Sequence, residues 1–493
     1  MLRFLLGGRL GIKSTYQMIN RLRLEGNSSI QKFDKLVQIV NSSEIEQFNE
    51  KYLCLTISMF LKSQSAKDNT IESAVESLCK RLCVTELSLQ GCNQVLGAFA
   101  SMTVPLNETH LFVCRKILQQ FIEKYLVNCP NREFSNIFWA SCVLKLHSDL
   151  DPHLTTNVLE SMDCADLALV CAGLMERPSS DLWPLVRADL LNRTKFTQKN
   201  IGSIMCSLAC AGVNDRELIA HLVEAAETLL NEKNMPAIVW AISTCDFVHV
   251  GVRDAVVRLL TNTSTARMSE IDVRRISRAF ALWGDLKKIE PWLMLQTAGG
   301  LHTETSICDS VLVWELVTNF CFESALKIFR NKPLLEWKRG GISGSQVYHL
   351  YLASLLKNGP VLSIEESNWL LSLQAMYADD DISSSMLHRQ ASNGLNELNI
   401  SHVSEYKDPL TGYVLDIYIP SLKLGIEIQG PTHFFTNINT GELILRPPDK
   451  FKHEVLKSVS HIPILQLTPW NFGPKIKSKY SVQIKNLLAK RTL

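Results

Sequence analysis

The sequence predicts a mostly α-helical chain in which an α-helical repeat solenoid is followed by a small α/β domain. Three observations lead to this prediction. Apolar residues recur every three or four positions over residues 40–360, and a short pattern returns there roughly every 36 residues. Alternating apolar and polar residues begin only near residue 400. A length of 493 residues with 46% hydrophobic residues suits two or three folded regions.

Residues 1–30 predict an organelle-targeting segment. Five basic and no acidic residues lie in 1–24, among Leu, Ile and Phe. This composition is typical of a mitochondrial or plastid transit peptide, and a basic amphipathic helix of the mature protein is the alternative. We therefore expect the mitochondrial matrix as the location, with a plastid as the second choice. No stretch reaches the roughly 18 uncharged apolar residues of a membrane span, so no span is expected.

Residues 40–360 predict an array of helix-turn-helix units of roughly 36 residues. Six segments align on pairs whose second residue is small: Gly97-Ala98, Trp139-Ala140, Cys171-Ala172, Cys206-Ser207, Trp240-Ala241 and Arg278-Ala279. A weaker seventh match contains Trp314. Small residues let neighbouring helices approach closely, and a unit that cannot bury its apolar face alone must stack on the next. An irregular helical bundle is the alternative.

A stacked array would offer an extended surface to a peptide or to a single-stranded nucleic acid, and the period does not choose between them. The residues between the two basic ends of the chain, 25–445, carry a net charge of −11. A contact with RNA in the array therefore needs a local basic stripe. The densest basic run comprises Arg253, Arg258, Arg267, Arg274, Arg275 and Arg278. A solvated helical face is the other interpretation of this run.

Residues 380–493 predict the α/β domain with a basic tail. A helix ending between Gly394 and Leu398 precedes three alternating segments, "ISHVSEY", "GYVLDIYI" and "KLGIEIQG". A basic helix, "DKFKHEVLKSV", and an apolar strand, "IPILQLT", follow. Residues 446–493 carry ten basic residues against two acidic ones. This end of the chain is therefore suited to an anionic partner.

Two carboxylates stand in neighbouring predicted strands. If Ser421 and Leu422 form a two-residue turn, strand alternation places Asp416 opposite Glu427 with Cβ atoms roughly 5 Å apart. Because carboxylates so close repel, a bound cation, a neighbouring Lys or Arg, or a shared proton must offset the repulsion. A slipped register would instead leave both acids in solvent.

The segments "GYVLDIYIPSLKLGIEIQGPTHF" and "DKFKHEVLKSVSHIPILQLTPWNF" resemble the RAP domain, an RNA-binding module abundant in apicomplexan parasites. The resemblance covers about residues 405–475, with Asp416 in D-I-x-x-P and Glu427 in I-E-x-x-G-P-x-H-F. Proteins of this family join an array of helical repeats to a terminal RAP domain, act in mitochondria or plastids and bind organellar RNA. The resemblance implies such a role in RNA stability, RNA processing or assembly of a ribonucleoprotein such as the mitochondrial ribosome.

The RAP fold is in turn similar to restriction-endonuclease-like nucleases, whose core is D…(D/E)-x-K. This resemblance makes Asp416, Glu427 and Gln429 the candidate catalytic residues, with Asp416 and Glu427 as ligands for Mg²⁺. Gln429 stands in the place of the lysine, and a glutamine has no charge with which to stabilise a developing anion. Binding without cleavage is therefore expected, and a metal-dependent endoribonuclease is the alternative. Groups that could replace the lysine are His433, Lys450, Lys452 and His453.

RNA binding requires basic groups for phosphates and aromatic faces for unpaired bases. The candidates are Lys423, His433, Phe434, Arg446, Lys450, Lys452, Lys457, Trp470, Lys475, Lys477 and Lys479. Core packing is the alternative for Phe434 and Trp470. The expected partners are organellar rRNA or mRNA and mitochondrial ribosome proteins. A structural scaffold for a mitochondrial assembly is the remaining alternative.

Overall fold

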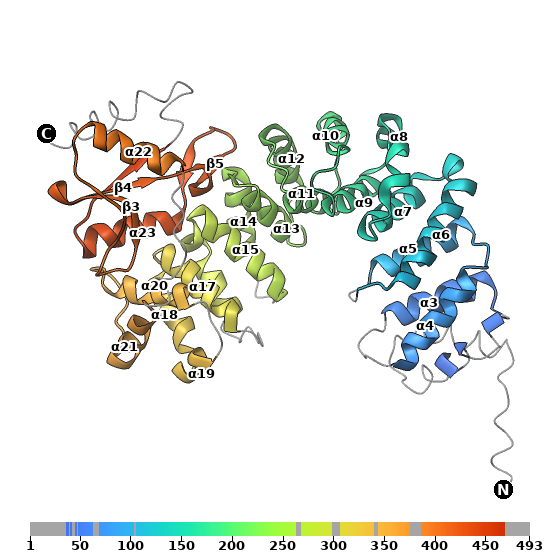
Figure 1. Ribbon diagram of the computed structural model, residues 1–493, viewed down its shortest axis with the longest axis horizontal. Helices are drawn as coiled ribbons and strands as arrows, with labels where there is room; N and C mark the ends of the chain where they lie inside the picture. Colours follow the sequence, from blue (N-terminus) through green and yellow to red (C-terminus); the bar gives the residue numbers. More distant parts are fainter. Residues whose placement is uncertain are drawn as a thin grey trace, which may run out of the picture. The chain divides into compact units, whose positions relative to one another are not determined.

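The chain is mostly helical, with a small region of mixed β-sheet near its C-terminal end (Figure 1). The computed structural model describes residues 36–468 except 39, 42–44, 47, 63–68, 103–104, 263–267, 298–305, 340–343 and 375–385. The predicted targeting segment lies outside the described residues. Contacts divide the chain into two compact units, Met1–Val213 and Asn214–Leu493. No helix in the described ranges has both the length and the apolar character needed to cross a membrane.

The first unit is built from helices that pack in succession. Its helices are α3 (Glu50–Lys62), α4 (Asn69–Leu82), α5 (Leu89–Ala100), α6 (Glu108–Lys124), α7 (Asn131–Val143), α8 (Thr156–Ser161), α9 (Cys164–Met175), α10 (Trp183–Asn192) and α11 (Ile201–Cys210). Helix α3 packs against α5, α5 against α7, α7 against α9, and α9 against α11. Ala98 and Ala140 are buried, and a Cβ added to Gly173 would lie 3.1 Å from the Cα of Trp139. Small residues therefore allow the close approach of α7 and α9.

Polar side chains begin several of these helices. Ser88, Asn107, Thr155 and Asp163 each accept a hydrogen bond from an amide in the first turn of α5, α6, α8 and α9, respectively. These amides have no partner inside their own helix, so each cap satisfies a donor and marks where the helix starts.

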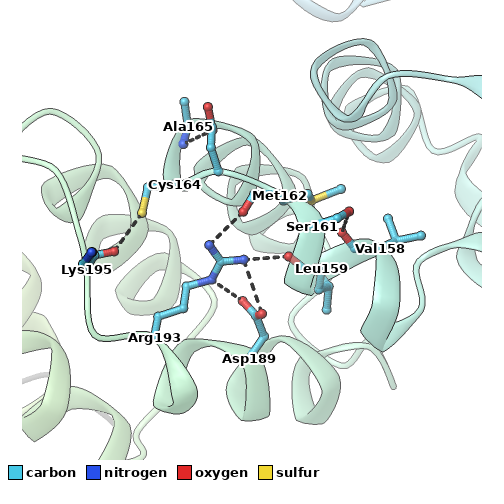
Figure 2. Close-up of polar contacts among 10 residues, drawn as sticks. Val158, Leu159, Ser161, Met162, Cys164, Ala165, Asp189, Arg193 and Lys195 are labelled. Carbon is cyan, nitrogen blue, oxygen red and sulfur yellow. Dashed lines mark hydrogen bonds and ion pairs between the residues drawn. The ribbon is translucent and has the colours of Figure 1, made fainter.

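Arg193 joins α8 to α10 (Figure 2). Its guanidinium donates to the carbonyl oxygens of Leu159 and Met162 at 2.6 and 2.9 Å, and to the carboxylate of Asp189 at 2.6 Å. The Arg193 and Asp189 side chains are only 16% and 5% exposed. The arginine thus satisfies carbonyls at the C-terminal end of α8 while its charge is balanced by a buried acid.

The second unit continues with helices and ends in the α/β region. Its helices before that region are α12 (Arg216–Leu229), α13 (Met235–Thr244), α14 (Val250–Asn262), α15 (Glu270–Trp283), α16 (Glu290–Thr297), α17 (Ser306–Thr318), α18 (Phe322–Arg330), α19 (Leu334–Arg339), α20 (Gly344–Ser354) and α21 (Ile364–Ser372). Helices α13, α15, α17 and α20 pack each against the next. All seven segments aligned in the sequence are helical, because each contains apolar residues at helical spacing.

The α/β region contains a four-stranded sheet between two helices, α22 (Met386–Glu397) and α23 (Pro447–Val459). Its strands are β2 (Val403–Lys407), β3 (Val414–Ile419), β4 (Leu424–Ile428) and β7 (Ile464–Leu467), in the order β2-β3-β4-β7. β7 is parallel to β4, and the other pairs are antiparallel. Leu395 of α22 packs with Ile417 and Ile426 on one face, and Lys452 of α23 reaches Glu427 from the other. These strands and both helices match the elements predicted from the sequence.

A second, smaller sheet was not predicted. It has the order β1-β5-β6, with strands β1 (Phe247–Val248), β5 (Phe434–Asn437) and β6 (Leu443–Leu445). β1 belongs to the helical part of the unit and pairs in parallel with β5. Arg446 pairs with Asp246 beside it. Because a strand of two residues is too short to show an alternating pattern, a sheet shared by the helical and α/β parts could not be predicted from the sequence.

Candidate functional site

The register of β3 and β4 places Asp416 and Glu427 together. Ile417, Tyr418 and Ile419 pair with Ile426, Gly425 and Leu424, and this register continues to Asp416 opposite Glu427. The strands are joined by a turn in which the Lys423 amide donates to the Pro420 carbonyl at 3.2 Å. The alternate residues of β3 point into the apolar core, so both acids lie on the face toward α23. The register expected from the sequence is confirmed.

Glu427 is a buried carboxylate with a lysine partner. It is 5% exposed, and its Oε1 lies 2.8 Å from the Nζ of Lys452. The same Nζ donates to the carbonyl oxygen of Val414 at 2.7 Å. Burial raises the pKa of Glu427, the nearby Asp416 also raises it, and Lys452 lowers it. Of the three ways to offset the repulsion between the acids, the structure contains the neighbouring lysine.

Asp416 also has a hydrogen-bond partner within the protein. Its Oδ2 accepts a hydrogen bond from the backbone amide of Ile428 at 2.6 Å. This contact takes the place of a backbone ladder bond where the β3–β4 pairing ends. Asp416 thus accepts from a strand amide, and Glu427 pairs with an ammonium group. Two carboxylates that are already engaged in this way are poor ligands for a divalent cation. Among the described residues, moreover, no group of three or more His, Cys, Asp or Glu side chains is arranged to hold a metal ion.

Gln429 is enclosed and not open to solvent. Its side chain is fully buried, and its Nε2 lies 3.3 Å from the Nε2 of His453. The Nδ1 of His453 lies 3.0 Å from the Nε2 of Gln466. Burial, followed by the charge of Lys452, lowers the pKa of His453 to about 4. His453 is therefore neutral at physiological pH and links the buried Gln429, just after β4, to the exposed Gln466 of β7.

His433 and Asp449 form a hydrogen-bonded pair, here called the dyad, close enough to Glu427 and Asp416 for their charges to act on the histidine. The Nδ1 of His433 lies 3.0 Å from the Oδ1 of Asp449, and the histidine side chain is 39% exposed. The hydrogen bond to Asp449 raises the pKa of His433, and the charges of Asp449, Glu427 and Asp416 raise it further, against an opposing effect of burial. Asp449 was not among the predicted site residues; it lies in the first turn of α23, sixteen residues from its partner.

The other predicted RNA-binding residues are spread over the domain. Lys423, Lys450 and Lys457 are exposed. Phe434 is buried at 8% exposure. The guanidinium carbon of Arg446 lies 4.5 Å from the ring centre of Phe435. Trp470, Lys475, Lys477 and Lys479 lie outside the described residues.

Four of the six arginines in the predicted basic run form ion pairs with acids. Arg253 pairs with Asp254 and Asp285, Arg274 with Glu270, Arg275 with Asp272 and Arg278 with Glu315. Arg267 lies outside the described residues. These ion pairs reduce the net positive charge that the run presents, so proximity of arginines alone does not make a phosphate-binding stripe.

We expect Asp449→Asn to lower the pKa of His433, because the hydrogen bond to the Asp449 carboxylate is the largest influence that raises it. NMR titration of the histidine ring protons measures this shift. A raised pKa in the folded state stabilises the fold at low pH, and this stabilisation is lost as pH rises through the raised value. Glu454→Gln, an exposed change in the same helix, should leave the His433 titration unchanged. An unchanged titration in Asp449→Asn would contradict the assignment of the dyad.

The site thus combines two carboxylates that have protein partners, a buried glutamine beside a neutral histidine, and a second histidine that is half-exposed. Comparison with known proteins finds no matching family model and no matching curated protein.

Proposed function

We propose that the protein is a mitochondrial RNA-binding protein, in which a helical-repeat solenoid precedes a RAP-type domain that binds RNA without cutting it. The observation that carries this proposal is the ion pair between Glu427 and Lys452. Lys452 engages the Oε1 of Glu427 and the Ile428 amide engages the Oδ2 of Asp416, so a metal ion would have to compete with protein partners for both acids. The resemblance of residues 405–475 to RAP domains supplies the link to organellar RNA.

Hydrogen bonds between neighbouring helix-turn-helix units support the solenoid. Side-chain hydrogen bonds repeatedly join residues roughly one repeat apart, as expected for stacked units of similar length. In the first unit these include Gln120 to Leu87, 33 residues apart, and Arg132 to Asp166, 34 apart. In the second unit they include Trp283 to Phe247 and Arg330 to Glu366, both 36 apart. A bundle with irregular connections would not repeat this separation.

The exposed lysines of the α/β domain support binding to the phosphate backbone of RNA. Lys423, Lys450 and Lys457 are accessible, and the half-exposed His433 has a raised pKa that favours its cationic form. Such groups neutralise phosphates and release bound counterions, so affinity should fall steeply with salt. The biological outcome that we propose is RNA stability, RNA processing or assembly of the mitochondrial ribosome.

Binding and cleavage assays with labelled organellar RNA test this function. We expect salt-sensitive binding and no cutting in Mg²⁺ or Mn²⁺. The control is the isosteric double variant Asp416→Asn, Glu427→Gln, which keeps the shapes of both side chains. Metal-dependent cutting that this variant abolishes would establish the endoribonuclease alternative. Undetectable or salt-insensitive RNA binding would instead favour a protein scaffold.

A further inference from the structure

A row of flat side chains crosses three helices of the second unit, α13, α15 and α17, of which α15 packs against the other two. Trp240 comes from α13, Arg275 and Arg278 from α15, and Trp314 from α17. The guanidinium carbon of Arg275 lies 5.7 Å from the ring centre of Trp240, and that of Arg278 lies 5.6 Å from the ring centre of Trp314. We call these four residues the Trp–Arg row. In Figure 1 the three helices lie in the green-to-yellow part of the chain.

The Trp–Arg row lies at the repeat position singled out in the sequence. Trp240 and Arg278 occupy the first place of the aligned pairs, and Trp314 occupies it in the seventh segment. Their neighbours Ala241 and Ala279 are buried, whereas the four row residues are partly exposed. The small residue therefore holds the helices together, and the residue before it faces outward at a regular interval.

A buried acid positions one member of the row. Glu315 is 3% exposed and lies 2.9 Å from Arg278, which is 41% exposed in its side chain. Burial raises the pKa of Glu315 to about 6, and the arginine opposes this shift. The carboxylate engages the Nη1 of the guanidinium beside the Trp314 ring, and other N–H groups of Arg278 remain available to a ligand.

Indole rings and guanidinium planes are surfaces on which unpaired bases stack, and guanidinium groups also contact phosphates. A regular row of both suits a strand whose bases are exposed. A duplex, whose bases are already stacked on one another, cannot use these faces. An acidic peptide would use the charges but leave the tryptophan faces without a matching group.

We propose that the Trp–Arg row, in the helical part of the second unit, is a binding site for unpaired bases of single-stranded RNA. This inference rests on the proposed function and names the part of the array that contacts the RNA. It also explains how a net acidic region with paired arginines can contact RNA, because stacking requires flat faces more than net charge.

Fluorescence anisotropy with a single-stranded RNA and a duplex RNA of equal length tests the row in the full chain. We expect Trp240→Ala and Trp314→Ala each to weaken single-strand binding about tenfold. Arg275→Gln and Arg278→Gln should also weaken single-strand binding, with little change in its salt dependence because both arginines are already paired with acids. Matched controls outside the row are Trp369→Ala, a partly exposed tryptophan of α21, and Arg330→Gln, an arginine ion-paired with Glu366. Both controls should bind like the wild type.

Ultraviolet crosslinking of wild-type protein to the same RNA gives a readout that does not depend on the folding of variants. Crosslinks at Trp240 or Trp314 support the row. Folded variants with wild-type affinity, or crosslinks confined to the α/β domain, overturn it while leaving the proposed function intact. Equal binding of duplex and single strand, or competition by polyglutamate that depends on the row, also overturns the assignment. A wild-type protein that binds no RNA refutes the proposed function itself.

Discussion

Arg193→Ala is expected to destabilise the first unit by about 3–5 kcal/mol, because the change leaves a buried charge without its partner. The Asp189 side chain is 5% exposed, so its carboxylate cannot recover hydration without local unfolding. The carbonyl oxygens of Leu159 and Met162 lose a charged donor at the same time (Figure 2). The helices that depend on these contacts, α8 and α10, should open first.

Hydrogen exchange of the backbone amides measures this effect better than one melting curve, since a chain of two units need not unfold in one step. Faster exchange is expected across α8 and α10. Lys80→Ala is the control, because Lys80 and Glu76 are 72% and 55% exposed and such a pair contributes little. Replacing both partners, as in Arg193→Met with Asp189→Leu, should restore part of the protection. Unchanged exchange in Arg193→Ala would refute the role given to this arginine.

Local patterns predicted the α/β elements well because each pattern lies within a single strand or helix. Alternation identified β3 and β4, and the pleat then placed Asp416 opposite Glu427. The same alternation placed Glu427 and Gln429 on one face of β4, but it could not show that α23 covers that face. Gln429 is consequently fully buried beside His453.

Contacts between distant residues left no such pattern. Arg446 forms an ion pair with Asp246, 200 residues earlier in the sequence. The two-residue strand β1 pairs with β5, which also follows it by nearly 190 residues. The pairing of His433 with Asp449 left no pattern for the same reason, because a single acid in the first turn of a basic helix is also what favours the start of a helix. Pairings set by tertiary packing have no period, so only the structure reveals them.

Lys452→Met is expected to destabilise the α/β region by about 3–5 kcal/mol at neutral pH, since it leaves the Glu427 carboxylate buried without a cation. Lys452 also donates to the carbonyl oxygen of Val414, which loses that donor in the variant. Lys450→Met, an exposed change two residues earlier in α23, is the control and should alter stability by less than about 0.5 kcal/mol. Denaturation or hydrogen exchange of β3, β4 and α23 provides the measurement.

The pH dependence separates this explanation from a simple loss of packing. Burial already raises the pKa of Glu427, and removing Lys452 takes away the charge that lowers it. A group whose folded-state pKa is raised stabilises the fold below its ordinary pKa and loses that contribution as pH rises through the raised value. The deficit of Lys452→Met relative to wild type should therefore be largest at neutral pH and shrink as Glu427 becomes protonated in acid. Adding Glu427→Gln should restore most of the stability at neutral pH and remove this pH dependence, whereas a deficit that is constant with pH would show that Lys452 acts through packing alone.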